Sequence, residues 1–189
     1  MRRIRSHTGY FENQGVVSGS EETTVEGPPF RVLFLSQRNS ARSMLAEAIA
    51  NSVGRGQLEA FSAGVRPASR VDPIAAELLQ HAGLPVPDHP PQHVREFSAP
   101  DSPPLDFVFT LSDTAAGEAP PIWPGHPITA HWHCTDPEQF EDEAERRLAL
   151  IRARTELERR LRVFANLPVQ SLDRISLQAH VDALGSSHN

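Results

Sequence analysis

The sequence predicts an α/β domain, a three-layer sandwich in which a central four-stranded parallel sheet lies between helices. Short apolar runs with the composition of strands alternate along the chain with segments of helical periodicity. Strands and helices that alternate in this way predict a parallel sheet with right-handed crossovers and helices on both faces. The length of 189 residues suits one domain and is enough to bury a sizeable core.

The first strand and the first helix have the clearest local signals. Residues 31–35 contain four consecutive apolar residues rich in strand formers, which indicates a buried strand. Strong helix formers begin at Ala41 and Arg42, and we expect Asn39 or Ser40 to cap this helix. The short polar loop between the two elements therefore joins the end of a strand to the start of a helix.

The other elements are indicated by periodicity, prolines and turn residues. Asp72 and Pro73 are typical of a helix start, and Gly83 is typical of a helix end. After Pro137, apolar residues recur at helical spacing with glutamate and arginine between them, which predicts a helix whose solvated face carries ion pairs. In chain order we expect a strand at 58–62, a helix from 73 to about 83, a strand at 105–111, a loop at 112–125, a strand at 128–133, a helix from 137 to 168 and a shorter helix at 171–184.

Composition excludes several classes of function. The net charge of -6 argues against a nucleic-acid partner, and no apolar run approaches the ~18 residues of a membrane span. All 18 basic residues are arginine, so a Schiff-base lysine and a lysine-type nucleotide loop are excluded. A single cysteine, Cys134, cannot form an intramolecular disulfide. We therefore expect a cytoplasmic protein with no cofactor, and the sequence predicts no oligomeric state.

The chain divides into a tail and one domain. Residues 1–29 are rich in Gly, Ser, Glu and Thr and lack periodicity, which predicts a flexible N-terminal extension. Residues 30–189 form the predicted domain. Polar residues follow its predicted strands, at Ser36, at 62–64, at Ser112 and at Asp136. In parallel sheets ligands bind beyond the carboxyl ends of the strands, so these residues predict a site on one rim.

The loop after the first strand has the features of an oxyanion site. A tight loop at a helix start gathers backbone N–H groups at the positive end of the helix dipole. Arg42 can add a bidentate guanidinium to the same anion. The predicted oxyanion-binding residues are Ser36, Gln37, Arg38, Asn39, Ser40, Ala41, Arg42 and Ser43.

This loop resembles that of the low-molecular-weight protein tyrosine phosphatases and of the thioredoxin-coupled arsenate reductases that share their fold. That family has a cysteine, five residues, an arginine and a serine directly after the first strand, and this chain matches it at Asn39 and through residues 39–43. Where the family has its nucleophilic cysteine, the chain has Ser36. Further matching segments lie at 61–64, 71–73, 111–116, 123–125, 131–132, 136–137 and 168–184, so the resemblance covers roughly residues 30–185.

The resemblance assigns roles to three residues. It implies a nucleophile position at Ser36, a binding arginine at Arg42 and a general acid at Asp136, the last worth about 10²–10⁴-fold in the family's reaction. Serine is a poor substitute for cysteine, because a hydroxyl has a far higher pKa than a thiol and usually needs an adjacent base. The two further cysteines that resolve the covalent intermediate in arsenate reductases correspond to Ser112 and Pro120. Anion binding is thus expected to survive and turnover to be lost.

Plainer interpretations exist for the other candidate residues. Asp136 before a proline is also a common helix cap. Cys134 is more simply explained as core filler than as a relocated nucleophile. His131 and His133 would point to the same face of a regular strand, and with Cys134 or Asp136 they suggest a metal. No tetrahedral site of convincing spacing results, so no metal site is predicted.

Three functions follow from these observations. The first is a catalytically silent protein that binds phosphate, arsenate or a phosphorylated protein or small molecule. The second is an arsenate reductase or protein tyrosine phosphatase whose active-site cysteine was changed to Ser36. Pro120 would not follow from such a single change, so we favour a natural degenerate member. The third, a nucleotide- or flavin-binding domain, lacks both a G-x-G-x-x-G turn and a lysine-bearing loop.

Overall fold

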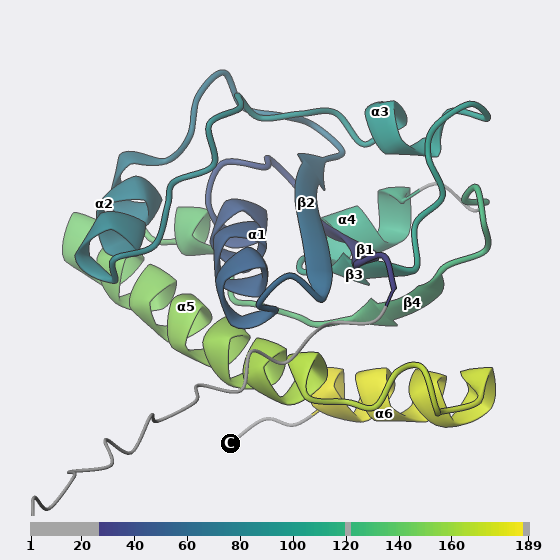
Figure 1. Ribbon diagram of the computed structural model, residues 1–189. Helices are drawn as coiled ribbons and strands as arrows, with labels where there is room; N and C mark the ends of the chain where they lie inside the picture. Colours follow the sequence, from purple (N-terminus) through teal and green to yellow (C-terminus); the bar gives the residue numbers. More distant parts are fainter. Residues whose placement is uncertain (1–26, 120–121, 187–189) are drawn as a thin grey trace, which may run out of the picture.

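The computed structural model describes residues 27–119 and 122–186, and it contains a four-stranded, fully parallel sheet covered by helices on both faces (Figure 1). The strands lie in the order β2-β1-β3-β4. Their bounds are Phe30–Ser36 for β1, Leu58–Gly64 for β2, Phe107–Thr110 for β3 and Ile128–His131 for β4. The predicted three-layer α/β fold class is confirmed.

The register of the sheet brings the carboxyl ends of the strands to one edge. Ser36 is the partner of Gly64, and Leu35 is the partner of Thr110. Thr110 in turn is paired with His131, the last residue of β4. The central strand β1 is apolar on both faces because it is covered by helices on both sides, as expected for a parallel sheet. The loop after β1 therefore starts in the middle of this edge.

The helices confirm most of the predicted order, with different bounds. They are α1 (Arg42–Val53), α2 (Pro73–His81), α3 (Arg95–Ser98), α4 (Asp113–Glu118), the 3₁₀ turn η1 (Pro137–Gln139), α5 (Glu143–Ala165) and α6 (Arg174–Ser186). The predicted start of α2 is confirmed, since the Asp72 carboxylate accepts hydrogen bonds from two N–H groups of the first turn. Gly83 follows this helix with a positive φ, as a terminating glycine does.

Three local predictions are wrong. The long helix begins at Glu143, after a separate 3₁₀ turn, because two aspartates cap two successive starts: Asp136 caps η1 and Asp142 caps α5. The predicted loop 112–125 contains α4, which Ser112 caps through a hydrogen bond from the Ala115 N–H. Neither Asn39 nor its neighbour caps α1, whose N-cap Ala41 has no side-chain acceptor.

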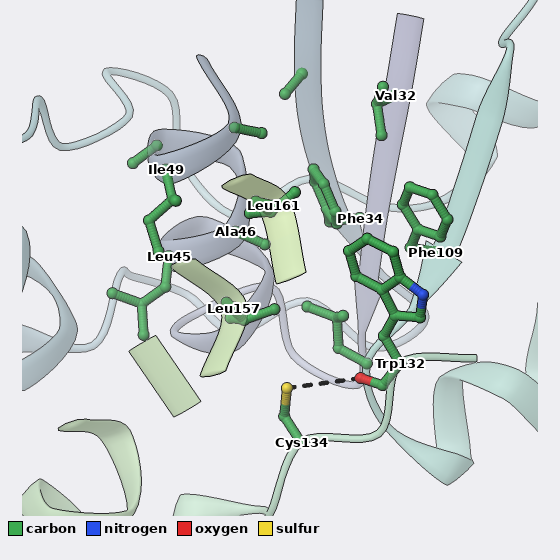
Figure 2. Packing of buried hydrophobic residues seen from close by; sticks show 14 of the residues in the cluster. Val32, Phe34, Leu45, Ala46, Ile49, Phe109, Trp132, Cys134, Leu157 and Leu161 are labelled. Atoms are coloured by element: carbon green, nitrogen blue, oxygen red, sulfur yellow. Dashed lines mark hydrogen bonds between the residues drawn. The ribbon is translucent and has the colours of Figure 1, made fainter. Parts of the chain in front are cut away.

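The larger core lies between one face of the sheet and helices α1, α2, α5 and α6. Phe109 of the sheet stacks on Trp132 at a centroid distance of 4.1 Å, and Phe164 of α5 meets the Phe109 ring edge-on at 5.2 Å. Figure 2 shows Phe109 and Trp132 in this core, with Leu157 and Cys134 nearby. The bulky rings fill the space that the short β3 and β4 leave under the long helix.

A smaller core covers the opposite face. Leu33 and Leu35 of β1 pack there with Ala115 of α4, Val94 before α3 and Trp123. Both faces of β1 are therefore apolar, and each face is covered by one of the two cores. Within the described residues, no helix combines the length and the apolar composition needed to cross a bilayer.

Candidate functional site

The loop from Ser36 to Ser43 leaves the middle of the sheet edge and enters α1 after a series of bends. The following segment holds its backbone carbonyls from outside: the N–H groups of Arg66, Ala68 and Asp72 donate to loop oxygens at 2.9, 2.9 and 2.8 Å. These three hydrogen bonds fix the backbone of the loop at Gln37, Arg38 and Ser40.

Several of these N–H groups have no protein acceptor. Among the residues that the structure describes, the backbone N–H groups of Ser40, Ala41 and Arg42 make no hydrogen bond to the protein. They lie at the N-terminus of α1, a helix of 12 residues, where the macrodipole is positive. All three residues line a small pocket together with Ser36. The arrangement fits a negatively charged ligand.

Asn39 determines the shape of the loop. Its φ of 47° lies in the left-handed region, which asparagine tolerates better than most residues. Its buried side chain donates to Ser43 Oγ at 2.9 Å and to Ser62 Oγ at 2.8 Å, and its Oδ1 accepts from the N–H of Gln92 at 2.7 Å. One amide thus ties together the loop, β2 and the segment before α3.

A chain of polar groups continues behind Asn39. Ser62 Oγ donates to Glu47 Oε2 at 2.5 Å, and His89 Nε2 lies 3.0 Å from Glu47 Oε1. Burial raises the pKa of the Glu47 carboxyl above its usual value, although the bonds from Ser62 and His89 oppose that shift. For His89, burial opposes protonation, but the bonds to the Pro90 carbonyl and to Glu47 prevail and raise its pKa. Sequence patterns gave no signal for this group.

Ser36 lies at the bottom of the pocket, almost fully buried. Its Oγ accepts a hydrogen bond from the Asn39 N–H at 3.2 Å and lies 2.8 Å from Ser43 Oγ. Ser43 Oγ accepts a hydrogen bond from the Asn39 side-chain amide, so its own hydroxyl hydrogen is free to point at Ser36 Oγ. The Ser36 hydroxyl can then direct its hydrogen toward a ligand. Among the described residues, no carboxylate or imidazole is hydrogen-bonded to Ser36 Oγ.

Arg42 reaches across the pocket to the chain after β4. Its Nη1 donates to the Cys134 carbonyl at 3.0 Å, and its Nη2 forms an ion pair with Asp136 Oδ1 at 3.3 Å. The guanidinium is 7% exposed and the carboxylate 38%. The pocket that both residues help to line has a volume of about 10 Å³, which holds about one water molecule. A tetrahedral anion therefore has to displace Asp136 from Arg42.

A wider hollow of about 550 Å³ adjoins the pocket. It shares Arg38, Ser40, Asp72 and Glu138 with the pocket and is lined further by residues 68–71, by α2 and by the start of α5. Arg146, which bonds Asp72 at 2.7 Å, contributes positive charge to its wall. The hollow has room for whatever group carries a bound phosphate.

Gly64 allows the loop to pack tightly on β2. A Cβ at this position would lie 2.9 Å from the Asn39 nitrogen and 3.0 Å from the Gln37 oxygen. Such distances are too short for a real side chain and involve backbone atoms, which cannot rotate away. The absence of a side chain at Gly64 is therefore a condition for the observed loop position.

The predicted site residues come together as expected in part. The small pocket is lined by six of the predicted residues, Ser36, Arg38, Ser40, Ala41, Arg42 and Asp136. Ser43 Oγ is hydrogen-bonded both to Ser36 Oγ and to the Asn39 side-chain amide. Gln37 contributes through its backbone carbonyl, which Arg66 binds. Ser112 is occupied as a helix cap, and Pro120 lies outside the described residues.

Cys134 is a core residue. It is 1% exposed and its Sγ donates weakly to the Trp132 carbonyl at 3.5 Å, as Figure 2 shows. Burial raises the pKa of its thiol to about 12, so the thiolate is not available as a nucleophile at neutral pH. The interpretation of Cys134 as core filler is confirmed.

The sequence profile described as "Low molecular weight phosphotyrosine protein phosphatase" matches residues 31–177. The chain belongs to this family. The matched residues include the loop from Ser36 to Ser43, the four strands except Phe30, and Asp136. The family resemblance expected from the loop motif is thereby confirmed.

Relatives and solved structures of the family include several arsenate reductases. The glutaredoxin arsenate reductase of Synechocystis sp. is 31% identical over 108 residues, which are 57% of this chain and 79% of that protein. The crystal structure of the Archaeoglobus fulgidus arsenate reductase is 30% identical with a TM-score of 0.54, covering 71% of this chain and 98% of that one. An arsenate reductase solved in its phosphate binding state is 25% identical with a TM-score of 0.55, covering 70% and 96%.

Proposed function

We propose that this family member binds a tetrahedral oxyanion, phosphate or arsenate, in the loop from Ser36 to Ser43 and does not turn it over. The observation that carries the proposal is the set of unbonded N–H groups at Ser40, Ala41 and Arg42, three residues that line the pocket at the start of α1. Backbone donors at a helix N-terminus and a bidentate arginine are the usual means of binding such anions.

The absence of turnover follows from Ser36. A hydroxyl nucleophile needs a base to take its proton, and within the described residues Ser36 Oγ has only the Asn39 N–H and the Ser43 hydroxyl as partners. Asp136, to which the family resemblance assigns the general-acid position, pairs with Arg42, and a general acid alone gives no turnover without a nucleophile. Cys134, with its raised pKa and buried sulfur, cannot take over that role.

A phosphorylated protein or small molecule would enter through the adjoining hollow, with its phosphate in the loop and its remaining atoms between Arg38 and Arg146. The hollow also contains Glu77 and Glu143, so it is polar and of mixed charge. The arsenate reductase in its phosphate binding state is a relative with the same overall fold, and it supports phosphate as a ligand of this loop. A cytoplasmic location stays a prediction, as does the domain boundary at residues 29 and 30.

The second candidate function is that of an arsenate reductase or protein tyrosine phosphatase whose nucleophilic cysteine has been changed to Ser36. One observation favours keeping it: Asn39, Ser43 and Asp136 still surround residue 36 as a catalytic loop would require. A thiol there could have its pKa lowered from about 8.5 into the ~3.5–7.5 range by the helix start and Arg42. Arsenate reduction would in addition need an external thiol, because Ser112 has none.

The first experiment measures phosphate binding by calorimetry. We expect one phosphate per chain for the parent protein and an affinity about 10–100-fold lower for Arg42→Ala, because two charge-assisted hydrogen bonds are lost. Arg152→Ala, on the exposed face of α5, is the matched control and should bind as the parent does. A parent protein that binds neither phosphate nor arsenate would contradict the proposal.

The second experiment separates the two functions. Ser36→Cys is assayed with p-nitrophenyl phosphate and with arsenate plus glutathione or thioredoxin, and Ser36→Ala serves as the inactive control. Hydrolysis by the cysteine variant alone would show that only the nucleophile is missing from a working site. Hydrolysis by the parent protein would overturn the assignment of Ser36 as silent.

A further inference from the structure

A cluster of three potential metal ligands lies at the carboxyl edge of the sheet, apart from the loop from Ser36 to Ser43, which we call the anion loop. It consists of Asp113 at the start of α4, His131 at the end of β4 and His133 two residues later. His131 Nε2 lies 3.1 Å from Asp113 Oδ1, and His133 Nδ1 lies 3.0 Å from the same oxygen. One ligand atom from each residue falls within 4.8 Å of the other two.

We propose that Asp113, His131 and His133 form a binding site for a divalent transition-metal ion of the zinc class. Two imidazole nitrogens and one carboxylate oxygen are the ligand set of open zinc sites, with a remaining position for water or a substrate. The proposal departs from the prediction of no metal site. That prediction considered Cys134 and Asp136 as third ligands, but Cys134 points into the core and Asp136 faces Arg42.

The spacing of the ligand atoms fits such an ion. With bonds of about 2.0–2.1 Å, a tetrahedral ion holds its ligand atoms about 3.3–3.4 Å apart. The two nitrogen–oxygen separations, 3.1 and 3.0 Å, are already close to that value. Both rings are partly exposed and the carboxylate is 79% exposed, so small side-chain rotations can complete the geometry and an ion has free access.

The backbone fixes where these side chains point. Trp132, between the two histidines, is fully buried and donates from Nε1 to the Val181 carbonyl of α6 at 2.8 Å. Since successive side chains of an extended chain alternate, His131 and His133 are directed to the opposite side, with ring centroids 6.0 Å apart. Ser112 caps the short helix that carries Asp113. The three ligands therefore come from anchored segments.

Thr110 supplies the outer contact that metal-binding histidines usually have. Its Oγ1 lies 2.8 Å from His131 Nδ1, because the two residues are partners in the β3–β4 register. When a metal ion takes the lone pair of Nε2, the nitrogen that faces Asp113, the Thr110 hydroxyl is placed to accept the hydrogen that Nδ1 then carries. The orientation of His131 is thus the one a metal ligand requires.

The test is a titration of the full, tag-free chain with zinc chloride, followed by calorimetry. We expect one ion per chain, with the affinity lowered at least tenfold by Asp113→Asn and by His133→Ala. His81→Ala removes an exposed histidine of α2 and should leave binding unchanged. Cobalt(II) provides a second readout, since its visible d–d bands should intensify with the parent protein and with His81→Ala but not with the two ligand variants.

The role of Thr110 has its own readout. Thr110→Val should weaken zinc binding by about 10–100-fold while Thr110→Ser restores it, with melting temperatures of the metal-free proteins close to the parent's. The proposal is overturned if the parent binds no zinc, or if Asp113→Asn and His133→Ala bind it as the parent does. None of these residues contacts the anion loop pocket, so failure here leaves the phosphate experiment unaffected.

Discussion

At the scale of single residues, Asp136 is in competition with the ligand of its own site. Its Oδ1 pairs with Arg42 at 3.3 Å and fills the space in which an anion would place its oxygens. Asp136→Asn removes a negative charge that a bound phosphate has to displace. A partly exposed ion pair of this kind is worth about 0.2–1 kcal/mol, so phosphate should bind about 1.4–5-fold more tightly to the variant.

The measurement is the same calorimetric titration with phosphate, at low salt so that the charge effect is not screened. Glu141→Gln, an exposed charge neutralisation on the loop between η1 and α5, is the control for net charge alone. Equal affinities for Asp136→Asn and Glu141→Gln would mean that the pair with Arg42 does not oppose binding.

His89 gives the chain a pH-dependent contribution to stability. Its folded pKa is raised, despite the opposing effect of burial, by its bonds to the Pro90 carbonyl and to Glu47. A raised pKa means that the contribution is fully present below the unfolded value of 6.5 and is lost as pH rises through the folded value. The difference in unfolding free energy between the parent and His89→Gln should therefore shrink as pH rises from about 6 to about 8.

Urea unfolding at several pH values checks this, and taking the difference from His89→Gln cancels the groups that titrate alike in both proteins. Glutamine retains a hydrogen-bond donor for Glu47 but does not titrate. A difference that stays constant over this range, or grows with pH, would be incompatible with the arrangement described for His89 and Glu47.

At the scale of elements, the anion loop depends on its contact with β2. Gly64→Ala would place a Cβ 2.9 Å from the Asn39 nitrogen, and neither backbone can yield without moving the loop. We expect the variant to fold but to bind phosphate at least tenfold more weakly, because the N–H groups at Ser40–Arg42 lose their common direction. Gly83→Ala tests a glycine with open space around it and should leave phosphate affinity unchanged.

The readouts are phosphate calorimetry and far-ultraviolet circular dichroism on the same samples. Gly83→Ala carries some strain of its own because Gly83 has a φ of 67°, so a loss of stability there is expected and a loss of phosphate binding is not. Full phosphate affinity in Gly64→Ala would show that the loop is not held by this contact.

Elements that rest on local signals could be predicted from the sequence, and contacts between distant segments could not. The strand before Ser36, the cap at Asp72 and the terminating Gly83 each depend on a few neighbouring residues. The short helix α4 was missed because Gly117 and the prolines after it favour a loop, whereas the cap at Ser112 and packing of Ala115 in the smaller core outweigh that preference.

The site divides in the same way. The loop from Ser36 to Ser43 is one continuous motif, so its position at the start of α1 could be predicted, whereas Asp136 was placed opposite Arg42 only by the family resemblance. The support behind it joins Asn39 to Ser62 and Gln92, which are 23 and 53 residues away in the chain. Likewise the third ligand of the proposed metal site is 18 residues before His131. Pairings over such separations follow from the strand order, and no local pattern encodes them.

At the scale of the whole molecule, Phe164 joins the long helix to the sheet. It is 1% exposed, and its ring lies edge-on to Phe107, Phe109 and Trp132 at centroid distances of 4.9, 5.2 and 6.0 Å. Phe164→Ala would leave a cavity that these three rings, held in place by the strands and by each other, cannot fill. The expected cost is about 3–5 kcal/mol of unfolding free energy, measured in urea.

Val163→Ala is the matched control, because Val163 is the preceding residue of α5 and is 46% exposed. Val163→Ala should change the free energy of unfolding by less than about 0.5 kcal/mol, because substitutions of exposed side chains rarely change it more. Neither Phe164 nor the three rings around it line the pocket of the Ser36–Ser43 loop, so Phe164→Ala should keep its phosphate affinity wherever it remains folded. A cost for Phe164→Ala no greater than for Val163→Ala would mean that α5 is not anchored through this ring and that the larger core is packed differently.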